Sequence, residues 1–185
     1  SIILLTYINT RGVQSGKLIQ NVFTIAKLIA LFGLIAIGIG YGFKSGMLSQ
    51  NFEDAWSPSK TTSEGGVSAL GGIALLMALG VSMIGSLFSS DAWNNVTFIA
   101  GEIKNPQKNI GLSLFLGTLI VTLIYVSANL MYLSVLPLDQ IAFAQSDRVA
   151  VTASNIIFGG IGTYIIAAMI MVSTFGCNNG LILAG

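Results

Sequence analysis

Four apolar runs, each long enough to cross a lipid bilayer, dominate this sequence. The hydrocarbon core of a bilayer is about 30 Å thick, and a helix needs about 20 apolar residues to span it. In lipid every backbone N–H and C=O must be satisfied internally, so we predict helices and an all-α membrane protein. The predicted spans are Val22–Tyr41, about Leu70–Ala100, Ile110–Leu136 and about Ala153–Phe175.

The composition excludes an ordinary soluble domain. The chain is 54% hydrophobic and only 8% charged, whereas a soluble domain carries about 25% charged residues. Eight Lys and Arg with seven Asp and Glu cannot cover the surface of a soluble fold of 185 residues. The net charge of +1 provides no basic surface for nucleic acid. We therefore expect lipid to contact much of the chain.

Both ends of the sequence are apolar. Ser1–Ile8 resembles the end of another span, and Leu181–Ala184 continues the apolar character beyond the fourth one. We expect residues 1–185 to be one transmembrane domain fragment of a longer protein, whose remaining helices complete it.

Polar segments between the spans suggest an orientation. The short segments Asn9–Gln20 and Gly101–Asn109 carry four Lys and Arg and one acid, whereas the longer Gly42–Gly66 and Pro137–Val151 carry three cations and five acids. Lys and Arg prefer cytoplasmic loops. Together with the alternation that successive spans require, this preference places residues 9–20 and 101–109 in the cytoplasm.

Residue types needed for common enzyme chemistry are missing. The chain contains no histidine, and Cys177 is its one cysteine. This excludes an internal disulfide, a His/Cys zinc site and a His-based catalytic triad within the chain. We predict no catalytic residues, no metal site and no cofactor, and expect a protein that is not an enzyme.

Glycine is frequent, with 22 residues, and many lie within the spans. Small residues let helix backbones approach closely in lipid, so these glycines indicate helix contacts within a bundle. The glycines concerned are Gly33, Gly38, Gly40, Gly71, Gly72, Gly80, Gly85, Gly159, Gly160 and Gly162.

The second apolar run contains a polar interruption. As one helix, Leu70–Ala100 would be about 46 Å long, too long for one perpendicular crossing. Its inner part, from Ser86 to Asn95, holds Ser, Asn and Asp91 between apolar stretches. Broken helices are tolerated where the backbone lines a cavity, so we predict a break near Phe88–Ala92. Alternatively, the span ends at Phe88 and Ser89–Asp91 cap a short interfacial helix.

Lys27 stands inside the first full span, six residues after Asn21. Its ammonium could snorkel back to the headgroups along its four-carbon stem. Alternatively it faces the bundle, where it replaces a bound cation or binds unwound backbone. Polar residues near the end of the fourth span could then be its counterpart: Ser173, Thr174, Asn178 and Asn179.

Trp93-Asn94, followed by Glu102-x-x-Asn105-Pro106-x-x-x-Ile110, resembles the amino acid–polyamine–organocation (APC) superfamily, and within it the L-type amino-acid transporter branch. The stretch from Gln20 to Lys27 is similar to the start of that family's fifth helix, and Ser173–Gly180 to the end of its eighth. The resemblance covers the chain as the end of helix four through helix eight.

This resemblance implies a LeuT-type inverted-repeat bundle with a discontinuous helix at about 70–100. It implies a substrate site in which Phe88 is an aromatic gate and the Phe88–Asp91 carbonyls accept the substrate ammonium. It also implies a helix-five lysine, Lys27, in the region of a sodium site. The implied substrate-binding residues are Phe88, Ser89, Ser90, Asp91, Trp93 and Asn94, and the implied ion-site residues are Lys27, Ser173 and Thr174.

Two positions depart from the family pattern: Asp91-Ala92 stand where many members have Gly-Gly, and Gly111 where many have Pro. We predict a multi-pass secondary transporter for amino acids in the cell membrane, whose partners are its substrate, the bilayer and the rest of its own chain. The rival interpretations are a membrane enzyme, for which Asp91 is the one predicted intramembrane carboxylate, and a channel or structural bundle.

Overall fold

The computed structural model describes residues 2–10, 13–53, 55–57, 59–61, 67–89 and 100–184, and most of them are helical. The α-helices are α1 (Ile2–Thr10), α2 (Val13–Ser45), α3 (Met47–Phe52), α4 (Gly72–Ser89), α6 (Pro106–Val135), α7 (Leu138–Ala142), α8 (Val149–Phe158) and α9 (Gly162–Ala184). Three 3₁₀ turns join them: η2 (Ala100–Glu102), η3 (Gln145–Asp147) and η4 (Gly159–Ile161). The prediction of an all-helical chain overlooked a short antiparallel hairpin of β1 (Ser59–Thr61) and β2 (Val67–Ala69), in which Lys60 pairs with Ser68.

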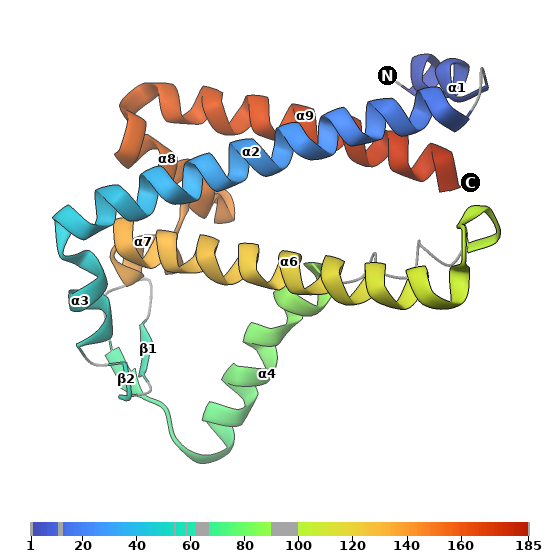
Figure 1. The fold of residues 1–185 in the computed structure, drawn as a ribbon. Helices are drawn as coiled ribbons and strands as arrows, with labels where there is room; N and C mark the ends of the chain where they lie inside the picture. The colour runs from blue at the N-terminus through green and yellow to red at the C-terminus, as the bar shows by residue number, and fades with distance from the viewer. Residues whose placement is uncertain are drawn as a thin grey trace.

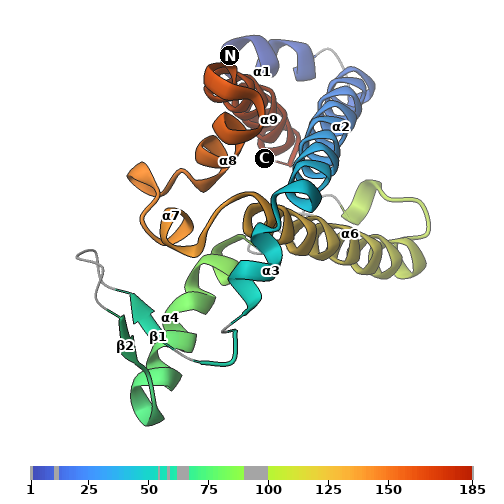
Figure 2. The same cartoon turned by 90° about the vertical axis from the view of Figure 1, so that its left-hand side faces the viewer.

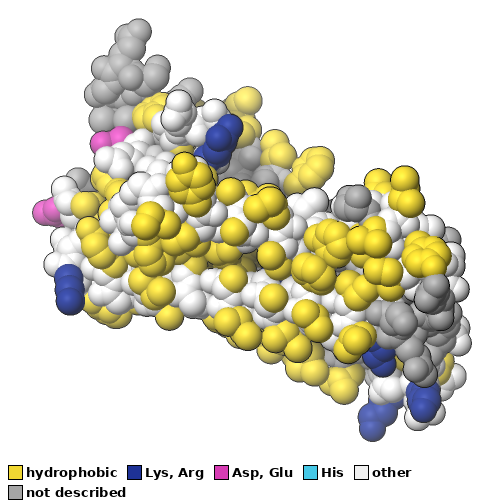
Figure 3. Space-filling model, turned by 90° about the horizontal axis from the view of Figure 1, so that it is seen from above, with side chains coloured by type: hydrophobic (Ala, Val, Ile, Leu, Met, Phe, Trp, Pro, Cys, Tyr) yellow, Lys and Arg dark blue, Asp and Glu magenta, His cyan; other side chains and the backbone are white. Residues whose placement is uncertain are grey.

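Three long helices, α2, α6 and α9, form the bundle (Figure 1). Within the described residues, three helical segments are long and apolar enough to cross a membrane: Gly16–Ser45, Pro106–Val135 and Val149–Ile182. Apolar side chains cover the face shown in Figure 3, and charged ones lie toward its two ends. The prediction of a helical multi-pass membrane protein is confirmed.

Two glycines bring α2 and α6 together. A methyl group on Gly38 would meet the side chain of Met131, and one on Gly42 would overlap Ser134 and lie 2.8 Å from its carbonyl oxygen. Gly38 and Gly42 are one helical turn apart, so both face α6. Beside them, Leu34 of α2, Met131 of α6, Ala153 of α8 and Ile166 of α9 share one buried cluster.

Gly42 is therefore expected to tolerate no side chain. In the full-length protein, Gly42→Ala should lower the free energy of unfolding by about 1–3 kcal/mol, the usual effect of overpacking. Gly40→Ala is the matched control, because no atom of the described neighbouring residues lies within 4 Å of a methyl group at that position. It should be neutral or stabilising by up to about 1 kcal/mol, the helix propensity difference. Thermal unfolding in detergent measures both, and equal stability of the two variants would contradict this contact.

The predicted fourth span is divided by a tight turn. Although Val149–Ile182 is, on average, apolar enough to cross a membrane, α8 ends at Phe158 and α9 begins at Gly162. Gly159 has φ 68° and ψ −152°, a conformation that essentially only glycine adopts. The Ser154 hydroxyl donates to the carbonyl of Gly162 at 3.1 Å, so the chain folds back on itself. The uninterrupted helix of this region is α9, rather than Ala153–Phe175.

The long helices also extend further than predicted. The helix α2 begins at Val13 and α6 at Pro106, so much of the predicted polar segments 9–20 and 101–109 is helical. A proline in the first turn suits a helix start, because its missing N–H has no partner there. The starts of α2 and α6 and the end of α9 lie at one end of the bundle, and α3, α7 and the start of α9 lie at the other (Figure 1).

Side chains at the end of α2 and in α3 form hydrogen bonds with the C-terminal end of α6. Asn51 of α3 donates to the carbonyls of Leu133 (2.7 Å) and Leu136 (2.8 Å). The Ser45 hydroxyl lies 3.0 Å from the carbonyl of Ser134. These contacts satisfy carbonyls that a helix end leaves without an intrahelical partner.

The helix α4 stands apart from the three-helix bundle. It runs from the hairpin back toward the rest of the chain (Figures 1 and 2), and in Figure 1 it ends level with the middle of α6. Its 18 residues make it about 27 Å long, and its apolar side chains are largely exposed. The described helix covers Gly72–Ser89, so only the outer part of the predicted span 70–100 can be compared with the structure.

Candidate functional site

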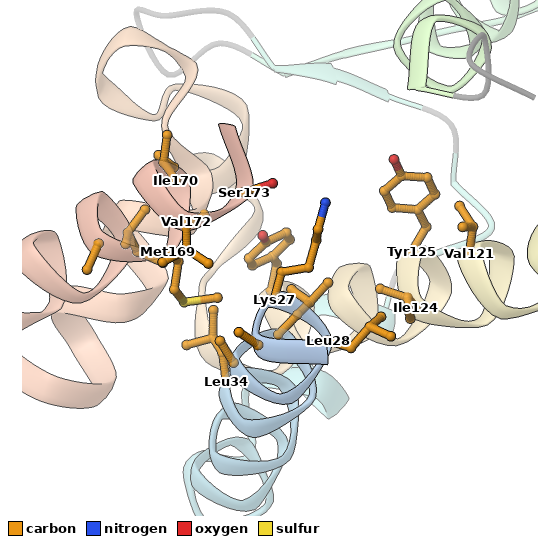
Figure 4. A pocket seen from close by; sticks show the side chains of 17 residues that line it. Lys27, Leu28, Leu34, Val121, Ile124, Tyr125, Met169, Ile170, Val172 and Ser173 are labelled. Atoms are coloured by element: carbon orange, nitrogen blue, oxygen red, sulfur yellow. The ribbon is translucent and has the colours of Figure 1, made fainter. Parts of the chain in front are cut away.

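A cavity of about 670 Å³ lies between α2, α6, α8 and α9 (Figure 4). Its wall is mostly aliphatic, and its polar side chains come from Lys27 of α2, Tyr125 and Tyr132 of α6, and Ser173 of α9. Leu34 and Ile166 lie in its wall and also belong to the buried cluster. The long helices therefore enclose one cation in apolar surroundings.

Lys27 is half-buried, and its amine points into the space between Ser173 and Tyr125 (Figure 4). Its Nζ lies 3.9 Å from Cys177 Sγ, within reach of a weak hydrogen bond to sulfur. A methyl group on Gly176 would lie 3.6 Å from the same Nζ. No carboxylate of the described residues forms an ion pair with Lys27. This lysine is directed at α9 near the middle of both helices.

The polar residues of α9 divide between two places. Ser173 lines the same cavity as Lys27, whereas Thr174 is exposed and is not part of the cavity wall. Asn179 does not face Lys27 and is instead fully buried against the first turns of α2. Consecutive helical positions are about 100° apart around the axis, so these residues cannot all share one face.

The residues of the predicted substrate site are only partly described. Phe88 and Ser89 belong to the last turn of α4, and Phe88 is 82% exposed. The first two residues of the predicted unwound stretch are thus helical. Ser90, Asp91, Trp93 and Asn94 lie outside the described residues.

Three residues near Lys27 were not singled out from the sequence as site residues: Cys177, Tyr125 and Tyr132. The tyrosines lie seven residues apart, hence on one face of α6, a spacing that sequence inspection can find. Cys177 follows Ser173 by four residues and shares its face for the same reason.

Comparison with known proteins identifies the family. The sequence profile described as amino acid permease matches residues 1–185, the whole chain. This chain belongs to the amino acid permease family. The resemblance to amino-acid transporters that the Glu102 to Ile110 motif suggested is thereby confirmed.

Curated relatives of this amino acid permease carry the same kind of name. The serine/threonine exchanger SteT of Bacillus subtilis is 30% identical over 184 residues, which is 100% of this chain and 37% of SteT. The b(0,+)-type amino acid transporter 1 of Oryctolagus cuniculus is 29% identical, with 97% of this chain and 33% of that protein covered. The large neutral amino acids transporter small subunit 2 of Homo sapiens is 30% identical, with 97% and 31% covered. The chain thus spans about a third of the length of these relatives.

Proposed function

We propose that this chain is the central part of a secondary transporter that carries amino acids across the cell membrane by alternating access. The observation that carries the proposal is the Lys27 cavity between α2, α6, α8 and α9 in a chain that matches amino acid permeases throughout. Bilayer lipid covers the exposed apolar faces, and the other helices of the same protein complete the site.

Lys27 takes the place of a transported or structural cation in this proposal. Once the other helices cover the half-buried Lys27, its ammonium needs oxygen partners other than a carboxylate, because leaving a charge unpaired in an apolar site is costly. Ser173 across the cavity is one such partner, and backbone carbonyls of helices outside this chain supply others. A fixed positive charge makes sodium binding at the same place unfavourable.

Substrate is held at the inner end of α4 in this proposal. Carbonyls at a helix C-terminus carry partial negative charge, so those from Phe88 to Asp91 suit the ammonium of an amino acid. In Figure 1 α4 ends level with the middle of α6, which supports a site near the bilayer midplane. Phe88 would cover the ligand, and Asp91 would contact its polar groups. Trp93 and Asn94 follow the predicted break and would support it from the part of the discontinuous helix that comes after it.

Neutral amino acids are the proposed substrate class. SteT is named for serine and threonine, and another relative for large neutral amino acids. Apart from Asp91, the predicted site contains no acidic residue, so one carboxylate would have to select any cationic side chain.

The carrier proposal is tested with the full-length protein in proteoliposomes. Saturable uptake of labelled amino acids without ohmic current is expected, because the cavity wall is mostly aliphatic and lacks polar rows along whole helices. Ohmic current without saturable flux would instead establish a channel, and absence of both would favour a structural or enzymatic role.

A cytoplasmic position for residues 9–20 and 101–109 is part of the proposal. In full-length protein carrying Cys177→Ser, with its other cysteines replaced, new cysteines at Ser57 and Asp147 should react with an impermeant thiol reagent added outside intact cells. Cysteines at Ser15 and Gln107 should react only after permeabilisation, because the Lys and Arg residues near these helix starts favour the cytoplasmic side. Labelling of Gln107→Cys in intact cells would reverse the orientation.

A further inference from the structure

Asn179 is a fully buried amide that joins three helices. Its Nδ2 donates to the carbonyl of Gly16 at 3.1 Å and to Gln20 Oε1 at 3.0 Å. Its Oδ1 accepts a hydrogen bond from Asn9 Nδ2 at 3.2 Å. Both amide hydrogens and the amide oxygen are therefore used, and α9 is tied to α1 and to the first turns of α2.

The helices α2 and α9 also meet at Lys27, which lies two helical turns after Gln20 along α2. A methyl group on Gly180 would lie 3.3 Å from Gln20 Nε2, and one on Gly176 would lie 3.1 Å from Phe23 Cβ. Because α2 and α9 run in opposite directions (Figure 1), these contacts continue in register to Lys27, which faces Cys177 and Ser173. Gln20 and Lys27 are seven residues apart and share one face of α2.

The contacts at Gly176 and Gly180 are van der Waals contacts without a direction. Alone they would leave α2 and α9 free to rotate and slide against each other. Asn179 stands on a different side of α9 from Ser173, about 120° around the axis at about 100° per residue. A directional hydrogen bond at that angle opposes rotation of α9 about its own axis, and the bonds to Gly16 and Gln20 oppose sliding. The hydrogen bonds of Asn179 therefore fix how α2 and α9 are placed relative to each other at Lys27.

We propose that Asn179, together with Gln20, is a positioning residue that holds Lys27 beside Cys177 and Ser173. Its importance for uptake rests on the transport function proposed above. The positioning of Lys27 itself does not rest on that function, because it concerns only the separation between the Lys27 amine and the Cys177 thiol.

Ortho-phthalaldehyde measures that separation directly. This dialdehyde condenses with an adjacent primary amine and thiol, losing two molecules of water, to form a fluorescent isoindole that bridges nitrogen and sulfur. The experiment uses full-length protein in which Cys177 is the one remaining cysteine. Isoindole should form in this protein, and it should be absent from Lys27→Arg and from Cys177→Ser. Absence from the parent protein would overturn the proposal.

Asn179→Ala should lower the isoindole yield at least about fivefold, because the directional bonds at the helix ends are lost. Gln20→Ala removes one of these bonds and should lower the yield less, which provides a second variant should Asn179→Ala fail to fold. Asn178→Ala is the matched control, since that side chain has no hydrogen bond among the described residues, and its yield should be unchanged.

Uptake measured on the same variants separates positioning from transport. Amino-acid uptake should fall in parallel with isoindole yield, with Asn178→Ala unchanged in both. An unchanged isoindole yield in folded Asn179→Ala and Gln20→Ala overturns the positioning role. Loss of isoindole with normal uptake overturns its link to transport. Loss of isoindole from these variants, in a protein whose parent also lacks uptake, supports the geometry while rejecting the proposed function.

Discussion

Lys27→Ala should lower amino-acid uptake by the full-length protein at least about tenfold, because hydrogen bonds to a charged group contribute about 1.5–3 kcal/mol. The alanine would remove the one cation that the described part of the chain contributes to the cavity wall. Initial uptake rates, normalised to the amount of protein in the membrane, measure the effect.

Lys17→Ala is the matched control for this substitution. Lys17 is exposed and stands ten residues earlier on the same helix, at the end of the bundle. Its loss should leave uptake near that of the wild type. Near-wild-type uptake by both variants would contradict the role of Lys27 in the cavity and would favour a snorkelling side chain.

Phe88→Ala should raise the substrate concentration for half-maximal uptake by about tenfold or more, because burying a phenylalanine side chain contributes about 1.5–3 kcal/mol. Phe88 is exposed at the end of α4 in this chain, so a bound ligand and the missing helices would have to cover it. Leu87→Ala is the neighbouring control on α4. A fully active Phe88→Ala with unchanged apparent affinity would contradict the assignment of the site.

Asp91→Asn tests the substrate class at the same site. Competition of uptake by a panel of neutral and cationic amino acids should show neutral competitors dominant in the wild type and unchanged in the variant. Neutral competitors should dominate because, apart from Asp91, the predicted site contains no acidic residue to bind a cationic side chain. The variant should be unchanged because the ammonium and carboxylate of a neutral substrate would provide its main contacts. A variant that loses only cationic substrates would contradict the neutral preference.

Apolar run length was sufficient to predict the helical membrane fold, but it did not locate every helix end. The run from Val149 to Ile182 has no charged residue and a high mean hydropathy, so hydropathy alone suggests continuous helix there. The turn depends on the backbone conformation of Gly159 and on the contact between Ser154 and Gly162. Three glycines within residues 159–162 were a signal, but they were interpreted as packing positions.

Glycine frequency likewise predicted close packing without selecting the right positions. Gly38 and Gly162 make close contacts as expected, whereas a methyl group added to Gly33, Gly80 or Gly85 would have no atom of the described residues within 4 Å. Gly42 and Gly176 also pack closely, although they are not among the glycines for which the sequence predicted helix contacts. Contact depends on which face of a helix meets its neighbour, and composition carries no information about this.

Polar residues within helices were the hardest to interpret. Gln20 was placed at the end of the polar segment 9–20, yet it lies well inside α2, where its amide oxygen accepts a hydrogen bond from Asn179. The proximity of Lys27 and Ser173 came from the family resemblance, and Cys177 joined them only in the structure. Partners more than a hundred residues apart in the sequence can be assigned only once the helix register is known.

Sodium dependence tests the central claim, that the Lys27 ammonium takes the place of a cation in an amino-acid carrier. The measurement is the initial rate of labelled amino-acid uptake into proteoliposomes of the full-length protein, in sodium buffer and in choline buffer at equal ionic strength. We expect saturable uptake at equal rates in both buffers, because the ammonium already supplies the positive charge. Uptake that strictly requires sodium would contradict it.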